Sequence, residues 1–357
     1  MQHRSPRSQT GGDNERGWRA FGPPAARAGR SRRYDGLADR LGVEVAEAAA
    51  ADGGFRHLAL LYRGAADYLS ALQGFVQGAL ARAEPVLVAV PQRKVSWLRQ
   101  ELPRAERVTF EDMTELGRNP ARIIPSVSAF VGSHSRQRVH SVVEPVWPER
   151  SADELREACR HEALLNMAFA DVAATIMCTY DLAGLPESVI TSAASTHPSL
   201  IRNGREQPSS SYLQPPGMPA DCDLPFSPPP ASAEILTYDR DLRPVRAVVT
   251  EAAQRAGLAA ERITDLVIAV SEVAANTLRH TAAGGTAYLW HTAGELVCQV
   301  SDTGMIADPL AGRRMPVGDL PGGKGLWLVN QMCDLVEVRT SPAGTTIRLH
   351  MRLGEPQ

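Results

Sequence analysis

Long apolar runs are missing from this chain of 357 residues: no stretch of about 18 consecutive apolar residues could cross a membrane. The first residues carry arginines but no apolar segment follows them, so we expect no signal peptide. Charges of opposite sign nearly cancel, at a formal net charge of −2, which argues against a dedicated nucleic-acid binder. We therefore expect a cytoplasmic protein that binds neither membrane nor nucleic acid directly.

Aromatic residues and lysines are scarce as well. Aromatic residues make up only 5% of the chain, so its core must be built mainly from Ala, Val and Leu, and the only lysines are Lys94 and Lys324. The five cysteines are odd in number and scattered, and none forms a Cys-x-x-Cys pair. Neither a disulfide framework nor a zinc site is therefore indicated.

Composition divides the chain into four parts. Residues 1–50 are rich in Arg, Gly, Ser and Pro without apolar periodicity, which predicts a disordered tail, with a short helix possible at Val43 to Ala51. Residues 51–203 and 233–354 carry apolar patterns and predict folded domains. Residues 204–232, dense in Pro and Ser, predict an extended and mobile linker.

Strand and helix patterns alternate in the first domain, which predicts a parallel α/β sheet covered on both faces. The expected strands are 55–62, 86–90, 108–110 and 173–180, and the expected helices are 65–83, 94–102, 121–132, 153–170 and 186–196. His161, Glu162 and Asn166 in the fourth helix are faintly similar to a histidine-kinase phospho-acceptor helix. No hairpin partner follows, so we expect His161 to be a surface residue.

Four features stand out in this domain, and they are Phe55-x-His57, the strand after Glu84-Pro85, Cys178-Thr179-Tyr180-Asp181 and Thr196-His197-Pro198. Together they resemble the MEDS sensory domain. The resemblance implies a RecA-like parallel α/β core without a P-loop, and indeed no G-x-x-x-x-G-K-[ST] motif is present. It also implies that an unknown small ligand is sensed. His57, Cys178 and His197 are candidates for that ligand site or for a metal site, although such residues are more often core or capping groups.

The second domain is organised around a helix at residues 263–279. Ile263, Leu266 and Val270 belong to one apolar stripe, while Glu272 and Asn276, four residues apart, share another face. A carboxylate can orient a hydroxyl or take its proton, and an amide oxygen can hold Mg²⁺. Taken alone, the pair would more often be a solvated polar face.

Three further motifs follow that helix. Asp302-Thr303-Gly304 ends an expected strand, Gly322-Gly323-Lys324-Gly325-Leu326 opens an expected helix, and Thr345 begins the last strand. Glycines permit close backbone approach to a ligand, and amides at a helix start bind phosphate. The ordered set resembles the N box and the two glycine boxes of the GHKL ATPases, and its short spacing looks most like the anti-sigma-factor serine/threonine kinases.

The GHKL resemblance implies a Bergerat-type α/β sandwich that binds ATP and Mg²⁺. By this resemblance Asn276 would hold Mg²⁺ and Glu272 would act as general base. Asp302, Gly304 and Thr345 would bind adenine. Gly323, Lys324, Gly325 and Leu326 would form the lid over the phosphates, although the loop with Arg313, Arg314 and Met315 departs from the usual pattern.

The resembled kinases also imply partners: a STAS-type anti-anti-sigma protein as phospho-acceptor, a sigma factor, and a second copy of the chain bound through the GHKL domain. Our leading hypothesis is an anti-sigma-type serine/threonine kinase regulated by the N-terminal sensor. The alternative is a non-catalytic, ATP-gated module that sequesters a sigma factor or another regulator. A histidine kinase is disfavoured because no dimerisation hairpin is evident.

Overall fold

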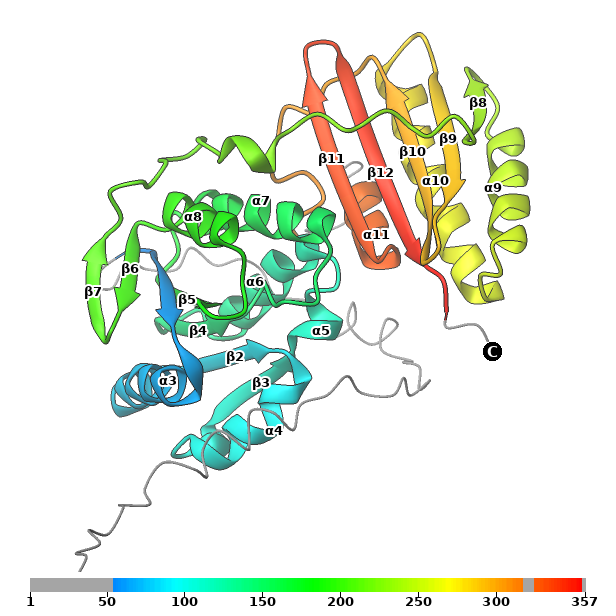
Figure 1. Cartoon of the computed structure of the whole chain (residues 1–357). Helices are drawn as coiled ribbons and strands as arrows, with labels where there is room; N and C mark the ends of the chain where they lie inside the picture. Colours follow the sequence, from blue (N-terminus) through cyan, green and yellow to red (C-terminus); the bar gives the residue numbers. More distant parts are fainter. Residues whose placement is uncertain (1–53, 317–323, 355–357) are drawn as a thin grey trace, which may run out of the picture.

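The computed structural model describes residues 54–316 and 324–354, which form two α/β domains, each built on its own sheet (Figure 1). The expected tail at residues 1–50, including the helix at 43–51, lies outside the described residues, as does Gly323.

The N-terminal sheet has the order β3-β2-β4-β5-β1-β6-β7, and every pair is parallel except β6 with β7. Its strands are β1 (Arg56–Tyr62), β2 (Val86–Val90), β3 (Val108–Asp112), β4 (Val139–Val143), β5 (Ala174–Asp181), β6 (Ser199–Arg202) and β7 (Arg205–Pro208). Its helices are α3 (Gly64–Ala81), α4 (Gln92–Glu101), η1 (Ala105–Arg107), α5 (Met113–Leu116), η2 (Pro120–Arg122), α6 (Ile123–Ser133), α7 (Ala152–Ala168) and α8 (Glu187–Thr196).

Both faces of this sheet are covered, as the all-apolar strands predict. Leu72 and Val76 of α3 and Leu98 of α4 pack on one face. Leu164 of α7 and Ala193 of α8 pack, with α6, on the other face. The predicted RecA-like parallel α/β class is therefore correct. The sequence patterns missed β4, whose apolar run is only five residues long and is interrupted by a histidine and a serine.

The C-terminal sheet is antiparallel throughout, with the order β11-β12-β10-β9-β8. Its strands are β8 (Glu234–Tyr238), β9 (Gly285–His291), β10 (Glu295–Asp302), β11 (Leu335–Ser341) and β12 (Gly344–Arg352). Helices α9 (Arg243–Arg255), α10 (Ala260–His280) and α11 (Lys324–Met332) cover one face, where Val249, Val270 and Val329 share a core with the sheet (Figure 1). This is the predicted GHKL α/β sandwich.

The two domains touch through polar and charged side chains. Asn119 donates hydrogen bonds of 3.1 Å to the backbone and side-chain oxygens of Asn330 on α11. Glu157 of α7, fully buried, pairs with Arg313 from the loop after β10. Leu310 of the same loop is buried in the core of the N-terminal domain. Helix α7 is thus enclosed between the sheet and the second domain.

This enclosure corrects the expectation for His161, which is wholly buried and not on the surface. Ten residues of α7 are buried, among them four with ionisable side chains besides His161: Glu154, Glu157, Arg160 and Glu162. From the sequence alone, a helix with this many charged residues appears half exposed. That face is lost on several sides, because Glu157 pairs with the C-terminal domain, Arg160 pairs with Asp223 of the segment at residues 204–232, and Glu162 faces β1 and β5.

The segment at residues 204–232 contacts both domains and is not a free spacer. It contains β7 and the short helix η3 (Ala220–Cys222), and Cys222 forms a disulfide bond with Cys159 of α7. Phe226 lies against the guanidinium groups of Arg339 and Arg348 on the C-terminal sheet. This disulfide corrects the expectation that none is present, and no sequence spacing indicates it because its two cysteines lie 63 residues apart.

Candidate functional site

Glu272 and Asn276 lie on the same face of α10, as their spacing predicts, and the start of α11 lies directly over them. A Cβ atom added to Gly325 would come within 2.9 Å of Glu272 Oε2 and 3.4 Å of Asn276 Nδ2. Only a glycine leaves room for the backbone at this position. The second glycine box and the carboxylate–amide pair therefore form a single site.

Asp302, at the end of β10, is held by two hydrogen bonds. Thr277 Oγ1 donates to Asp302 Oδ2 at 2.6 Å, and the Gly304 amide donates to Asp302 Oδ1 at 2.8 Å. Thr277 is one helical position beyond Asn276, so α10 both offers Asn276 and orients Asp302. The oriented carboxylate retains lone pairs that can accept a hydrogen bond from an exocyclic amine.

Thr345 supports the same corner from β12. It is paired with Asp302 in the β10–β12 register, and its hydroxyl donates to the Gly304 carbonyl at 2.9 Å. Gly304 is tightly enclosed, since an added Cβ would lie 3.0 Å from the Thr281 side chain. The sequence-predicted residues Asp302, Gly304 and Thr345 therefore meet at one end of the antiparallel sheet.

The N-terminus of α11 faces Glu272 and Asn276. Lys324, exposed, and Gly325 form its first turn, where free backbone amides and the helix dipole favour an anion. Leu326 also packs against Gly312, since a Cβ atom added to Gly312 would lie 2.8 Å from the Leu326 Cβ. The predicted role of Gly323 falls outside the described residues.

These residues fit Mg²⁺–ATP. Asn276 presents a hard amide oxygen, which in this structure accepts a 2.7 Å hydrogen bond from Arg279. Backbone approach is kept open at Gly304 and Gly325, and the first turn of α11 suits phosphate oxygens. Glu272 would remain available to orient an acceptor hydroxyl.

A second cluster lies in the interior of the N-terminal domain, and it joins His57 of β1, Cys178 of β5 and His197 at the end of α8. These three sequence-predicted residues meet a fourth, Glu162 of α7, whose Oε2 lies 3.0 Å from His57 Nε2 and accepts a hydrogen bond from Cys178 Sγ at 3.2 Å. All four are buried. Burial, aided by the neighbouring His197, lowers the pKa of His57 to about 4, so its ring is neutral at pH 7.

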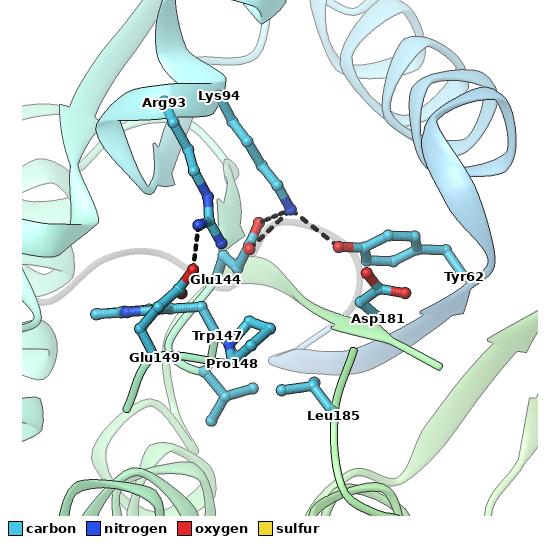
Figure 2. A pocket seen from close by; sticks show the side chains of 10 residues that line it. Tyr62, Arg93, Lys94, Glu144, Trp147, Pro148, Glu149, Asp181 and Leu185 are labelled. Carbon is cyan, nitrogen blue, oxygen red and sulfur yellow. Dashed lines mark hydrogen bonds and ion pairs between the residues drawn. The ribbon is translucent and has the colours of Figure 1, made fainter. Parts of the chain in front are cut away.

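A pocket of about 200 Å³ opens at the carboxyl ends of the parallel strands (Figure 2). Lys94, at the start of α4, reaches into it and contacts both oxygens of Glu144 at 2.8 Å and the Tyr62 hydroxyl at 2.9 Å. Trp147 and Leu185 supply apolar walls. This edge is where open α/β sheets bind small ligands, and none of the three predicted sensor residues lines it.

Sequence reasoning missed two important side chains. Thr277 was overlooked because threonine on a helix usually bonds back to its own backbone. Glu162 stood out in the sequence only as part of the stretch that is faintly similar to a phospho-acceptor helix. Its contact with His57 and Cys178 brings together residues separated by 105 and 16 positions, a link that no local spacing reveals.

Comparison with known proteins finds a matching family model for each domain. Residues 56–198 match the family model of the MEDS domain, "MEthanogen/methylotroph, DcmR Sensory domain", and residues 237–351 match "Histidine kinase-like ATPase domain". No curated protein matches. Among solved structures, the chain matches the crystal structure of the RsbU and RsbW domains of Rv1364c from Mycobacterium tuberculosis, with 23% sequence identity and a TM-score of 0.27. That alignment covers 36% of this chain and 34% of the other, too little to transfer a function.

Proposed function

Because this chain joins a MEDS sensory domain to a histidine kinase-like ATPase domain, we propose that it is an ATP-dependent protein serine/threonine kinase of the anti-sigma-factor type, regulated through its N-terminal domain. The observation that carries the proposal is the placement of Gly325 against Glu272 and Asn276. It supports the proposal because a helix start of a kind that suits phosphate then lies beside a carboxylate that can serve as base.

The residues divide the work of phosphoryl transfer between them. Asn276 holds the metal, Asp302 and Thr345 bind the adenine, and the first turn of α11 binds phosphate oxygens. Glu272 orients the acceptor hydroxyl and takes its proton. Bound Mg²⁺–ATP supplies the phosphoryl group and neutralises its charge, so positioning is most of what the protein must provide.

The acceptor we propose is a serine or threonine of a STAS-type anti-anti-sigma protein, and the sequestered partner is a sigma factor. The sensory input is a small molecule bound by the N-terminal domain. The pocket beside Lys94 has the size and the mixed polar and apolar lining for such a ligand.

The test is incubation of the full chain with Mg²⁺, γ-labelled ATP and the STAS-domain proteins of its host. We expect label on one STAS protein, and we expect Glu272→Ala to abolish labelling while ATP binding stays within about threefold. Glu251→Gln, an exposed carboxylate on α9, is the matched control.

Labelling by Glu272→Ala at the parental rate would contradict the base role. ATP binding without any labelled STAS protein would overturn the kinase and favour a module that sequesters its partner in an ATP-dependent manner. In that case Asn276→Ala should weaken partner capture only when ATP is present.

A further inference from the structure

The buried cluster of His57, Glu162, Cys178 and His197 is enclosed by β1 and β5 on one side and by α7 and α8 on the other. One ligand atom from each residue lies within 4.8 Å of all the others. No ATP-site residue takes part, so the cluster needs an explanation of its own. We propose that these four side chains bind one divalent metal ion of the Zn²⁺ type.

The separations between the ligand atoms suit a tetrahedral ion. His57 Nε2 lies 3.4 Å from Cys178 Sγ and 3.0 Å from Glu162 Oε2, and His197 Nε2 lies 3.3 Å from the same oxygen. Zinc bonds of about 2.0–2.3 Å place neighbouring ligand atoms about 3.3–3.7 Å apart at the tetrahedral angle. Four of the six separations, 3.0 to 3.4 Å, are therefore already close to these values, and all six lie within 4.8 Å.

The histidines are already held in the tautomer that a metal requires. Asn166 Nδ2 donates to the Thr196 carbonyl at 2.8 Å, which turns Asn166 Oδ1 toward His57 Nδ1 at 3.1 Å. His197 Nδ1 lies 2.8 Å from the Ala193 carbonyl. In both rings Nδ1 therefore carries the proton and donates it to an oxygen, so Nε2 presents a lone pair.

The centre of the cluster has too few protons for hydrogen bonding alone. Two imidazole lone pairs converge on a carboxylate oxygen, and the protons beside them are those of the Cys178 thiol and of the Tyr180 hydroxyl, which also bonds to Glu162. Among the described residues, His197 Nε2 and Glu162 Oε1 are buried without a partner at good hydrogen-bond geometry. Such a concentration of acceptors is costly inside a protein, and a central cation relieves it.

The donor set selects the metal class. Two imidazole nitrogens, one thiolate and one carboxylate suit a borderline-soft ion, and they exclude Mg²⁺ and Ca²⁺, which prefer all-oxygen sites. A pocket of about 290 Å³ between α7 and α8 is lined in part by Glu162, Tyr180 and Thr196. It provides a route by which an ion reaches the buried ligands.

The test measures metal in the full chain and does not require ATP or phosphoryl transfer, so it stands or falls apart from the proposed kinase. We expect about one zinc per chain after growth with zinc. After removal with a chelator, Co²⁺ should restore stoichiometric binding with the intense thiolate-to-cobalt absorption and tetrahedral d–d bands. This arm uses the unaltered chain, so folding of a variant does not enter.

Variants then assign the ligands. Cys178→Ser should remove the thiolate-to-cobalt band, and His57→Gln should weaken zinc at least about tenfold in chelator competition. The matched controls are Cys298→Ser, a buried free thiol in the other domain, and His140→Gln, a buried histidine of β4. Both controls should keep the metal and the spectrum.

Folded chain that takes up neither Zn²⁺ nor Co²⁺ would overturn the proposal and leave the cluster as a hydrogen-bonded core. A cobalt spectrum without thiolate character, or full zinc binding by Cys178→Ser, would overturn the assignment of these ligands.

Discussion

Gly325 lies against the two candidate catalytic and metal-binding side chains of α10, so it is sensitive to an added methyl group. We predict that Gly325→Ala, whose Cβ would lie 2.9 Å from Glu272 Oε2, lowers ATP affinity by about ten- to hundredfold, the effect of about 1–3 kcal/mol of overpacking. Calorimetric titration measures it. Gly74→Ala in α3, where an added Cβ meets nothing within 4 Å, is the control and should leave affinity unchanged. Equal affinity in both variants would contradict the close approach.

His350 makes stability depend on pH. Burial alone would lower the pKa of His350, but hydrogen bonds to Glu295 and Glu337 raise it from 6.5 to about 9. Because the folded pKa lies above the unfolded one, the stabilisation is fully present below about pH 6.5 and is lost as pH rises through about 9. We predict a loss of about 3 kcal/mol in the free energy of unfolding across that window.

Urea denaturation between pH 6 and 10 checks this prediction. His350→Gln should flatten the dependence, whereas His291→Gln, an exposed histidine of β9, should preserve it. A slope that survives His350→Gln would assign the effect to other groups.

The placement of the candidate ATP-site residues was predictable, because the motifs are local: Glu272 and Asn276 sit four apart on one helix, and Asp302 ends a recognisable strand. Their supporting residue Thr277 was not, since its bond to Asp302 spans 25 positions. Likewise His57 and Cys178 could be named as candidates, but the Glu162 that completes their cluster comes from a helix whose burial no periodicity shows.

At the scale of elements, helix α7 supplies buried ion pairs between the two domains. Its Glu157 is wholly buried and contacts two arginines of the C-terminal domain, Arg313 and Arg339. We predict that Glu157→Gln destabilises the protein by about 3–5 kcal/mol, because it removes the carboxylate that pairs with the buried Arg313 and leaves Arg339 with Glu337 alone. Hydrogen exchange in the described part of the loop after β10 should rise as well.

Thermal unfolding and exchange mass spectrometry give both readouts. Glu187→Gln, an exposed first-turn residue of α8, removes the same charge without a buried partner and should change stability by less than about 0.5 kcal/mol. Similar behaviour of the two variants would mean that the Glu157 contacts contribute little.

The elements themselves were mostly predictable, because the apolar runs of β1, β2 and β5 and the stripes of α3 and α10 are long enough to be read. The short strands β4, β6 and β8 were not. Each has four or five residues and pairs with a strand distant in sequence: β4 with β2 and β5, β6 with β1, and β8 with β9.

For the whole molecule, edge strand β8 is the surface we assign to self-association. Ile235 there is 66% exposed, and among the described strands β8 pairs with β9 only. We predict that the chain is dimeric in sedimentation equilibrium and that Ile235→Asp raises its dimer dissociation constant at least about tenfold, since it places a charge in an apolar contact. A monomeric parent chain would contradict the prediction.

The contact between domains was beyond sequence reasoning, which treated residues 204–232 as a spacer. Phe226 lies in a Pro- and Ser-rich stretch without periodicity, and its stacking on Arg339 and Arg348 depends on the finished sheet. A contact surface that forms between two folded domains does not produce a regular apolar pattern in the sequence of either domain.

The near absence of lysine has a practical consequence for chemistry on this protein. Of its two lysine side chains, Lys94 is buried against Glu144 in the N-terminal pocket, and Lys324 is exposed at the start of α11. An amine-selective acylating reagent should therefore modify the Lys324 side chain first. Its extent of modification gives a single-residue optical or mass signal from the nucleotide domain, and slow acylation of Lys94 reports separately on opening of the sensory domain.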